Sequence, residues 1–238
     1  MVILKQCFGL RVPYNFGPLG HIYASKQIWK SVVRPGDTVI DATCGNGHDS
    51  TQLAKLALTP SAGKVYCIDI QSEATTSTRN KFLSDPALSV FLSEERVSII
   101  TASHETFPPT IEPLSVALIC YNLGYLPGAK STPLSIPNTG TERPPLSNCK
   151  LITKTETTIA SLTNALPLIK DGGLLSVVAY PGHEGGEVET EAVKAFMAAL
   201  DEQVWRVYGN FPLNRPKSPV LMSAFRIDKT GKTRMESE

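Results

Sequence analysis

A glycine-rich turn follows a buried apolar run in the stretch Val39-Ile-Asp-Ala-Thr-Cys-Gly-Asn-Gly47. Gly45 and Gly47 allow a tight turn and let the backbone approach a ligand where a Cβ atom would clash. A helix pattern begins at once, so the amides of the turn and of Asp49 would face the carboxylate of a bound amino-acid moiety. Asp41 can accept hydrogen bonds from the ammonium group of that ligand, directly or through water. The turn therefore predicts a site for a nucleotide-type cofactor.

A second carboxylate, Asp69, ends the next apolar run and could accept hydrogen bonds from both ribose hydroxyls of such a cofactor. A nicotinamide or flavin site would share this logic, but Ser50 stands where the third glycine of G-x-G-x-x-G belongs. The stretch Asp41 to Gly47 instead resembles methyltransferase motif I, which favours S-adenosylmethionine as the cofactor. The alternative is purely structural: the glycines form a strand-to-helix turn, and Asp69 caps a helix.

Two further strand ends carry polar residues at the depth of this site. The third strand ends in Thr101-Ala-Ser-His104, where class I enzymes usually place a residue against the adenine, so Ser103 and His104 are candidates. A half-exposed loop histidine is the other interpretation of His104. The fourth strand ends in Asn122-Leu-Gly-Tyr125, which resembles the Asn-Pro-Pro-Tyr motif of amino-methylating enzymes.

That resemblance implies how an acceptor amine would be held. The Asn122 side-chain oxygen and the Leu123 carbonyl would accept hydrogen bonds from the amine, which aims its lone pair at the methyl group. The Tyr125 ring would stack on the base. In this chain Leu-Gly replaces Pro-Pro, so the rigidity of the loop differs.

His183 is a candidate for removing the proton that an alkylammonium acceptor carries at neutral pH. It lies in Tyr180-Pro-Gly-His183, which leaves the fifth strand at the same edge of the sheet as Asn122. A turn with a surface histidine is the alternative. A C5-pyrimidine methylase would need a cysteine nucleophile at the catalytic loop, and Tyr121-Asn122 offers none.

The elements that must position these residues alternate between short apolar runs and helix-like segments, which is typical of a parallel sheet covered by helices. Five runs predict parallel strands: Thr38 to Asp41, Lys64 to Ile70, Val97 to Thr101, Val116 to Tyr121 and Leu174 to Tyr180. Four segments predict helices: His48 to Leu58, Glu73 to Ser84 behind a Ser72 cap, Thr157 to Leu168 closed by Asp171-Gly-Gly173, and Val188 to Leu200.

The last two β-like runs, Gln203 to Tyr208 and Val220 to Ile227, are joined too closely for a crossover helix and predict an antiparallel hairpin. The predicted fold is therefore α/β, with a seven-stranded, mostly parallel sheet of the class I (Rossmann-like) methyltransferase type. Helices would cover both faces, and the terminal strand would run antiparallel. We expect residues 1–238 to form a single domain.

Composition sets limits on the class of protein. No run approaches the roughly 18 apolar residues of a membrane span, and the N-terminus lacks a signal-peptide core, so a protein that is neither membrane-bound nor secreted is expected. The five cysteines are scattered without a C-x-x-C pair, so we expect free thiols and no metal site: Cys7, Cys44, Cys67, Cys120 and Cys149.

Charge is distributed unevenly around a formal net charge of +1. Residues 1–36 form an acid-free basic segment that includes an expected helix, and Arg206, Arg215 and Lys217 form a second basic cluster. These clusters predict either RNA-binding patches or an ordinary solvated surface. Residues 126–150 hold five prolines and predict a long loop, either a lid or a tolerated insert.

Six segments together resemble one protein family: Asp41 to Gly47, Asp69-Ile-Gln71, His104, Asn122 to Pro127, Thr153 to Thr158 and Tyr180-x-Gly-His183. This family was long labelled "putative rRNA methylase" and is similar to the YtqB/MnmM proteins of bacteria and plants. The likeness runs from about Ile22 to Ile227, and the Pro-rich stretch is its main departure.

The resemblance implies S-adenosylmethionine-dependent methylation of the 5-aminomethyl group of wobble uridine in tRNA, giving 5-methylaminomethyluridine. The partner would be the tRNA anticodon stem-loop. A homodimer is possible, and the compartment would be the cytoplasm for a bacterial protein or a plastid or mitochondrion for a plant one. Two alternatives stay open: a methyltransferase for another RNA base or for small-molecule or protein amines, and a non-catalytic cofactor-binding subunit of an RNA-modifying complex.

The complete predicted site has three parts. The cofactor contacts are Asp41, Thr43, Gly45, Asn46, Gly47, Asp49, Asp69, Ile70, Gln71, Ser103, His104 and Asn122. The catalytic residues are Asn122, Tyr125 and His183, and the substrate contacts are Leu123, Gly124, Tyr125, Thr155 and Tyr180.

Overall fold

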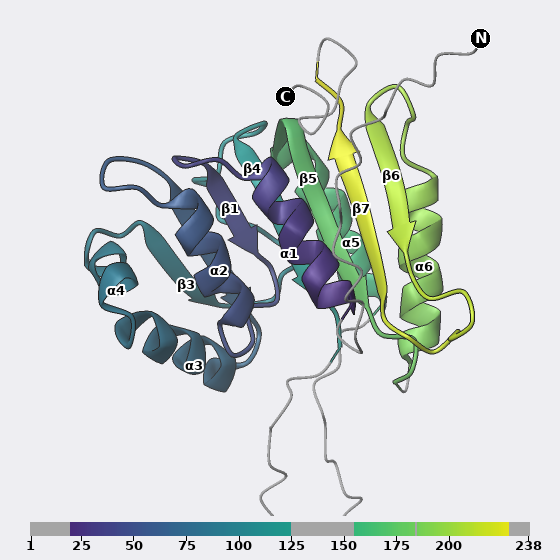
Figure 1. Ribbon diagram of the computed structural model, residues 1–238, viewed down its shortest axis with the longest axis horizontal. Helices are drawn as coiled ribbons and strands as arrows, with labels where there is room; N and C mark the ends of the chain where they lie inside the picture. The colour runs from purple at the N-terminus through teal and green to yellow at the C-terminus, as the bar shows by residue number, and fades with distance from the viewer. Residues whose placement is uncertain (1–19, 125–154, 184, 229–238) are drawn as a thin grey trace, which may run out of the picture.

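A seven-stranded sheet in the order β3-β2-β1-β4-β5-β7-β6 forms the centre of the molecule (Figure 1). The computed structural model describes residues 20–124, 155–183 and 185–228. Its strands are β1 (Thr38–Asp41), β2 (Lys64–Asp69), β3 (Val97–Thr101), β4 (Val116–Asn122), β5 (Ile169–Ala179), β6 (Trp205–Asn210) and β7 (Val220–Arg226). The pairs among β1 to β5 are parallel, whereas β7 runs antiparallel to both β5 and β6. The predicted sheet type and the predicted terminal hairpin are therefore confirmed.

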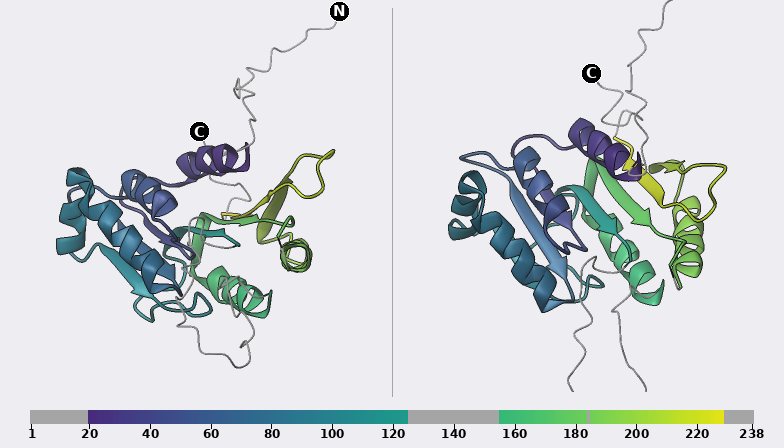
Figure 2. Two further views of the ribbon diagram at one scale, coloured as in Figure 1. Left: turned by 90° about the horizontal axis from the view of Figure 1, so that it is seen from below. Right: turned by 60° about the horizontal axis from the view of Figure 1, so that its bottom comes forward.

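Helices cover both faces of this sheet, so the fold has three layers (Figure 2). The helices are α1 (Gly20–Val32), α2 (His48–Ala57), α3 (Ser72–Leu83), α4 (Pro86–Ser93), α5 (Thr155–Ala165), the short 3-10 helix η1 (Leu166–Leu168) and α6 (Gly186–Ala198). One hydrophobic core joins α1 to α4 with one face of the sheet, and the other joins α5 and α6 with the opposite face. Strands covered on both faces read as continuous apolar runs, which is why the sequence predicts them well.

The local structure differs from the sequence predictions at three points. Ser72 does not cap α3: the N-cap is Gln71, and it makes no side-chain cap hydrogen bond. The helix α4 was not predicted, although Asp85 accepts a hydrogen bond from the Ala87 amide and Pro86 stands at the first helical position. The prediction that Asp171-Gly-Gly173 closes a helix is also wrong, because these residues lie inside β5.

The glycines in β5 accommodate an irregularity in its pairing with β4. Val116 pairs with Ile169 but Leu118 pairs with Leu174, so β5 holds extra residues between two normally paired positions. Gly172 adopts a φ of +72° there, a left-handed conformation that side chains disfavour. A Cβ on Gly173 would stand 2.7 Å from the Ile169 side chain. The two glycines therefore allow a bulge within β5.

The N-terminal helix α1 is anchored on the sheet next to the predicted site. Its Trp29 indole donates a 3.0 Å hydrogen bond to the Ser176 hydroxyl on β5, and both groups are buried. Its first turn lies near the carboxyl end of β5, because His21 contacts Tyr180. The sequence expectation of a helix within residues 1–36 is confirmed. No helix in the described part of the chain is long and apolar enough to cross a membrane.

Candidate active site at the carboxyl edge of the sheet

The glycine turn between β1 and α2 is held tightly against α3. Gly45 and Gly47 adopt φ values of +50° and +73°. A Cβ on Gly47 would stand 2.9 Å from the Thr78 Cα atom, so only glycine fits there without a backbone shift. The Thr78 hydroxyl donates a 3.0 Å hydrogen bond to the Gly45 carbonyl. The predicted turn is therefore present, and α3 sets its shape.

Asp69 at the end of β2 fastens this turn to the next loop. One of its carboxylate oxygens accepts a 2.9 Å hydrogen bond from the Gly45 amide, and the other accepts a 3.0 Å bond from the Gln71 amide. Each oxygen keeps a further lone pair, and the side chain is only partly buried. The carboxylate is thus placed beside the turn, where the predicted contact with the ribose hydroxyls requires it.

Asp41 is buried beneath the turn with Ser50 as its partner. The Ser50 hydroxyl donates a 2.5 Å hydrogen bond to one carboxylate oxygen, and the Thr43 amide lies 3.3 Å from the other. Burial, together with the nearby charge of Asp49, raises the pKa of Asp41 to about 7. Ser50 replaces the third glycine of a dinucleotide motif because its hydroxyl serves this buried carboxylate.

The far side of the turn offers an apolar surface and an imidazole. Ile70 follows Asp69 and is 54% exposed, which is high for a large aliphatic side chain next to buried strands. His104 is largely buried against the Tyr121 ring, and its Nδ1 has no hydrogen-bond partner among the described residues. Burial lowers the pKa of His104, so it is neutral near pH 7. An adenine bound on this side would cover Ile70, whereas the Nδ1 atom of His104 is buried and not open to a ligand in this structure.

Ser103 is less available to a ligand than His104, because its hydroxyl donates a 2.8 Å hydrogen bond to Glu105. Asn46 lies on the outer side of the glycine turn, where its side-chain oxygen accepts a 3.2 Å hydrogen bond from Ser77. Gln71 contributes its amide to Asp69. These three predicted contacts therefore lie at the site but already have protein partners.

Asn122 at the end of β4 is fastened to the glycine turn by two bonds. Its amide donates a 2.7 Å hydrogen bond to the Thr43 hydroxyl, and its side-chain nitrogen lies 3.4 Å from an Asp49 carboxylate oxygen. Lys26 of α1 lies 3.7 Å from the other Asp49 oxygen. The Asn122 residue itself is exposed. The structure therefore brings Asn122, Thr43 and Asp49 together, although they come from three different segments.

Aromatic and histidine side chains line the same edge where β5 ends. The Tyr180 and His183 rings lie 5.8 Å apart, and a Cβ on Gly124 would lie 3.6 Å from the Tyr180 ring. Burial and the charge of Asp49 raise the pKa of Tyr180 to about 12, although its side-chain hydrogen bond with Asn122 opposes this shift. Tyr180 therefore stays protonated and can donate a hydrogen bond.

One residue of this cluster was missed in the sequence. His21, in the first turn of α1, places its Nε2 atom 3.3 Å from the Tyr180 hydroxyl, with the two rings perpendicular. Burial lowers the pKa of His21, so the neutral imidazole can accept a hydrogen bond from the Tyr180 hydroxyl. No local motif marks it, since the contact joins residues 159 positions apart. We infer that His21 orients Tyr180.

Other predicted site residues keep the status of predictions. The Leu123 side chain is buried in the core and its amide donates to the Val178 carbonyl, whereas its predicted contact with the acceptor is made by its own carbonyl. Thr155 begins α5, and its predicted contact with the substrate also stays a prediction. Tyr125 and the Pro-rich stretch 126–150 lie outside the described residues. No group of three or more potential metal ligands occurs in the described parts of the chain, where Cys44, Cys67 and Cys120 are buried free thiols.

The edge of the sheet thus combines the parts that methyl transfer needs. The glycine turn and the partly buried Asp69 are arranged for a ligand that carries ribose, whereas Asp41 is buried beneath the turn and bonded to Ser50 and Thr43. Asn122 is bonded to the same turn through its backbone amide, and the residue is exposed to solvent. Because such a displacement has a good leaving group, positioning of the acceptor supplies most of the catalysis. The arrangement fits S-adenosylmethionine as the cofactor.

Comparison with known proteins gives the same result. The family model described as "Putative rRNA methylase" matches residues 65–142 and 144–226. A chloroplastic tRNA (mnm(5)s(2)U34)-methyltransferase of Arabidopsis thaliana is 36% identical over 219 residues, which cover 90% of this chain and 72% of that protein.

Two solved structures resemble the chain over almost their whole lengths. A "putative rRNA-methylase" from Clostridium thermocellum is 33% identical with a TM-score of 0.71, over 87% of this chain and 97% of its own. SMU.1697c, a "putative methyltransferase" from Streptococcus mutans in complex with SAH, is 27% identical with a TM-score of 0.66, over the same shares. The predicted enzyme class and the predicted cofactor, S-adenosylmethionine, are thereby confirmed. The chain belongs to the family described as "Putative rRNA methylase" and is a methyltransferase.

Proposed function

We propose that this protein transfers a methyl group from S-adenosylmethionine to the amine of a 5-aminomethyl group on the wobble uridine of tRNA. The observation that carries the proposal is the position of Asn122: its backbone amide is bonded to Thr43 of the glycine turn, and the residue, with its side-chain amide directed toward Asp49, is exposed. An amide that both donates and accepts hydrogen bonds suits an amine acceptor. The name of the Arabidopsis relative, a tRNA (mnm(5)s(2)U34)-methyltransferase, supports the RNA substrate.

Asn122 would hold the acceptor amine in line with the methyl group. Its backbone is fixed by the Thr43 hydroxyl at 2.7 Å, and its side-chain nitrogen is directed toward Asp49. This arrangement leaves the side-chain oxygen to accept a hydrogen bond from the amine, so the nitrogen lone pair points at the reacting carbon. S-adenosylmethionine supplies an activated methyl group when bound. Because the amine and the methyl group are held in the geometry of the reaction, methyl transfer becomes effectively unimolecular, which lowers its barrier.

The acceptor must also lose a proton, because an alkylammonium group has no lone pair to donate. His183 is the proposed proton acceptor, since it packs beside Tyr180 at the same edge and histidine is the side chain that most often serves as a general base. Tyr180 is not the base, because its pKa of about 12 keeps it protonated. Its hydroxyl would help to orient Asn122 instead.

A tRNA assay tests the proposal. The full chain is incubated with S-adenosylmethionine and tRNA that carries 5-aminomethyluridine, and the nucleosides are analysed by mass spectrometry. We expect that nucleoside alone to gain one methylene unit. If no gain is found on it, the acceptor assignment is wrong. Activity on free amines without RNA would favour the small-molecule alternative, and a stable hetero-complex without turnover would favour a non-catalytic subunit.

An Asn122→Ala variant separates acceptor binding from cofactor binding. We expect normal affinity for S-adenosylhomocysteine and a loss of turnover by about 10²- to 10³-fold, the usual effect of removing one positioned hydrogen-bonding group. Asn80→Ala, on the exposed surface of α3, is the matched control and should keep full activity. Turnover of Asn122→Ala at the level of Asn80→Ala would contradict the role of Asn122.

The cellular setting is part of the same proposal. The Arabidopsis relative is named as chloroplastic, which supports a plastid among the compartments predicted from the sequence. Fractionation of cells that express the tagged full-length chain would test this assignment. The predicted homodimer stays a prediction.

A further inference from the structure

The loop that joins β6 to β7 lies at the edge of the active site. Ala179, the last residue of β5, pairs with Val220 at the start of β7, so the loop is level with the carboxyl end of β5 (Figure 1). Gly182, next to His183, lies so close to this loop that a Cβ there would stand 3.1 Å from the Lys217 carbonyl oxygen. Whatever enters the site for methylation therefore passes close to residues 211–219, here named the hairpin loop.

This hairpin loop exposes apolar side chains that the described parts of the chain leave uncovered. Leu213 is 91% exposed and Phe211 is 46% exposed. The loop carries prolines at 212, 216 and 219, and two turns are closed by the hydrogen bonds Arg215 N to Pro212 O and Ser218 N to Arg215 O. Proline restricts the chain, so these apolar groups are presented in a preset arrangement. Large apolar groups held in water at the entrance of a site indicate a binding surface.

The charge around the loop points to a polyanion. Residues 203–227 contain Arg206, Arg215, Lys217 and Arg226 and no acidic residue. Arg215 and Lys217 lie in the exposed loop itself. Lys194 of α6 lies over the Phe211 ring at 5.7 Å, but it is also paired with Glu191, so we do not count it as a phosphate ligand.

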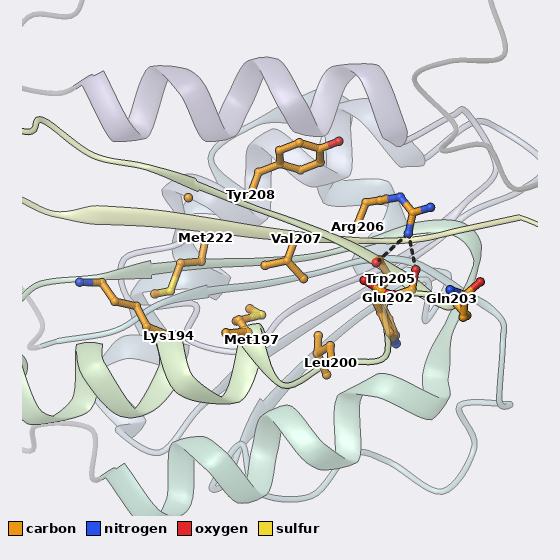
Figure 3. A pocket seen from close by; sticks show the side chains of 12 residues that line it. Lys194, Met197, Leu200, Glu202, Gln203, Trp205, Arg206, Val207, Tyr208 and Met222 are labelled. Atoms are coloured by element: carbon orange, nitrogen blue, oxygen red, sulfur yellow. Dashed lines mark hydrogen bonds between the residues drawn. The ribbon is translucent and has the colours of Figure 1, made fainter.

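Alternation along β6 places Tyr208 on the same side as Arg206; Tyr208 lies toward the hairpin loop, whereas Arg206 lies at the other end of the strand, opposite Phe225. Figure 3 shows Arg206 and Tyr208 on the α1 side of the strand, and Val207 and Met222 in a groove of about 680 Å³ on the α6 side. Tyr208 is 55% exposed and packs edge-on against Phe225, 5.8 Å between ring centroids. Basic and aromatic side chains therefore occur together from β6 into the hairpin loop.

We propose that the hairpin loop is the surface on which the protein binds the unpaired nucleotides next to the methylated base. This inference rests on the proposed function. Arg215 and Lys217 would contact phosphates, while Phe211 and Leu213 would offer faces on which exposed bases stack. Positive charge combined with stacking platforms is how proteins recognise single-stranded RNA. An acidic protein segment would match the charge but not the position beside an acceptor site for a nucleoside.

Binding to an anticodon stem-loop RNA that carries 5-aminomethyluridine, measured by fluorescence anisotropy at several salt concentrations, tests this inference. For the double variant Arg215→Gln/Lys217→Gln we expect the slope of log K against log salt to become smaller by about 1.4, since each lost single-strand phosphate contact removes roughly 0.7. The double variant Phe211→Ala/Leu213→Ala should bind about tenfold more weakly, with an unchanged salt slope.

The matched control is Arg79→Gln/Lys81→Gln on α3, which packs on β2 and β3 at the opposite end of the sheet. It removes the same charge and should bind like the wild type. All variants should keep the wild-type affinity for S-adenosylhomocysteine, which checks that they fold. If the hairpin-loop variants bind RNA like the control while the wild type methylates tRNA, this inference is wrong and the proposed function stands. If the wild type does not methylate the tRNA, both fail.

Discussion

Asp69→Ala is the substitution that best separates a cofactor ligand from a structural cap. The Asp69 carboxylate accepts amide hydrogen bonds from Gly45 at 2.9 Å and from Gln71 at 3.0 Å, and it is proposed to accept two more from the ribose. A hydrogen bond to a charged group contributes about 1.5–3 kcal/mol. Losing both ribose bonds should therefore weaken cofactor binding by about 3–6 kcal/mol, which is roughly a 10²- to 10⁴-fold higher Kd.

Calorimetric titration with S-adenosylhomocysteine measures this loss without turnover, and thermal unfolding of the free protein measures the loss of the two amide bonds. Asp69→Asn should give an intermediate affinity for S-adenosylhomocysteine. The oxygen of the new side chain can still accept a hydrogen bond, but its NH2 group would face one of the two backbone N–H groups that the carboxylate accepts from. Asp85→Ala is the control, since Asp85 also accepts a backbone amide bond but lies at the start of α4, away from the turn. If Asp69→Ala lowers only the unfolding temperature, as Asp85→Ala should, Asp69 is a cap and the cofactor model is refuted.

Two further predictions concern the same turn. The pKa of Asp41 in the folded protein, about 7, is higher than its ordinary value of 3.8. This group therefore contributes to the stability of the fold at low pH, and the contribution is lost as the pH rises from about 3.8 toward 7. In the wild type, the free energy of unfolding, measured with urea, should fall by about 2–3 kcal/mol between about pH 5 and pH 7 because of this group. The Asp41→Asn variant should not show this fall, and a variant with the wild-type pH profile would contradict the raised pKa. Gly47→Ala should destabilise the fold by about 1–3 kcal/mol and abolish cofactor binding, since its Cβ would meet Thr78 at 2.9 Å. Gly185 has a similar φ of +75°, but no atom lies within 4 Å of the position where a Cβ would stand. Gly185→Ala therefore tests backbone strain alone and should leave cofactor affinity unchanged; equal effects of the two substitutions would contradict the packing argument.

The central strands β1, β2, β4 and β5 could be predicted from the sequence because burial on both faces gives them nearly unbroken apolar runs. The predicted runs Thr38 to Asp41 and Val97 to Thr101 match β1 and β3 at both ends, and the other strands differ by a few residues. The start of β5 was missed because Asp171-Gly-Gly173 is typical of a turn, and only its pairing with β4 reveals a bulge within the strand. Helix α4 has a visible start signal in Asp85-Pro86, but its eight residues give little periodicity to detect.

The site was predictable where its chemistry lies on one continuous segment, as in the glycine turn, and less so where side chains meet across the fold. Ser50 was noted only as a departure from a dinucleotide motif, and its bond with the buried Asp41 explains the departure. His21 has no motif, and its role depends on α1 docking through Trp29 on β5. The partners of a side chain over such separations follow from packing, which sequence periodicity does not encode.

Charge divides this surface into two regions with different ligands. Asp41, Asp49 and Asp69 gather at the turn, and the charges of the latter two both raise the pKa of Asp41, so the three carboxylates repel one another. A cationic cofactor relieves that repulsion, and once the methyl group has been transferred the product has lost its sulfonium charge, so these carboxylates hold it less strongly. The same acids would repel a phosphate backbone. We therefore expect the attraction for RNA to come from the acid-free segment 203–227, next to the site but separate from it.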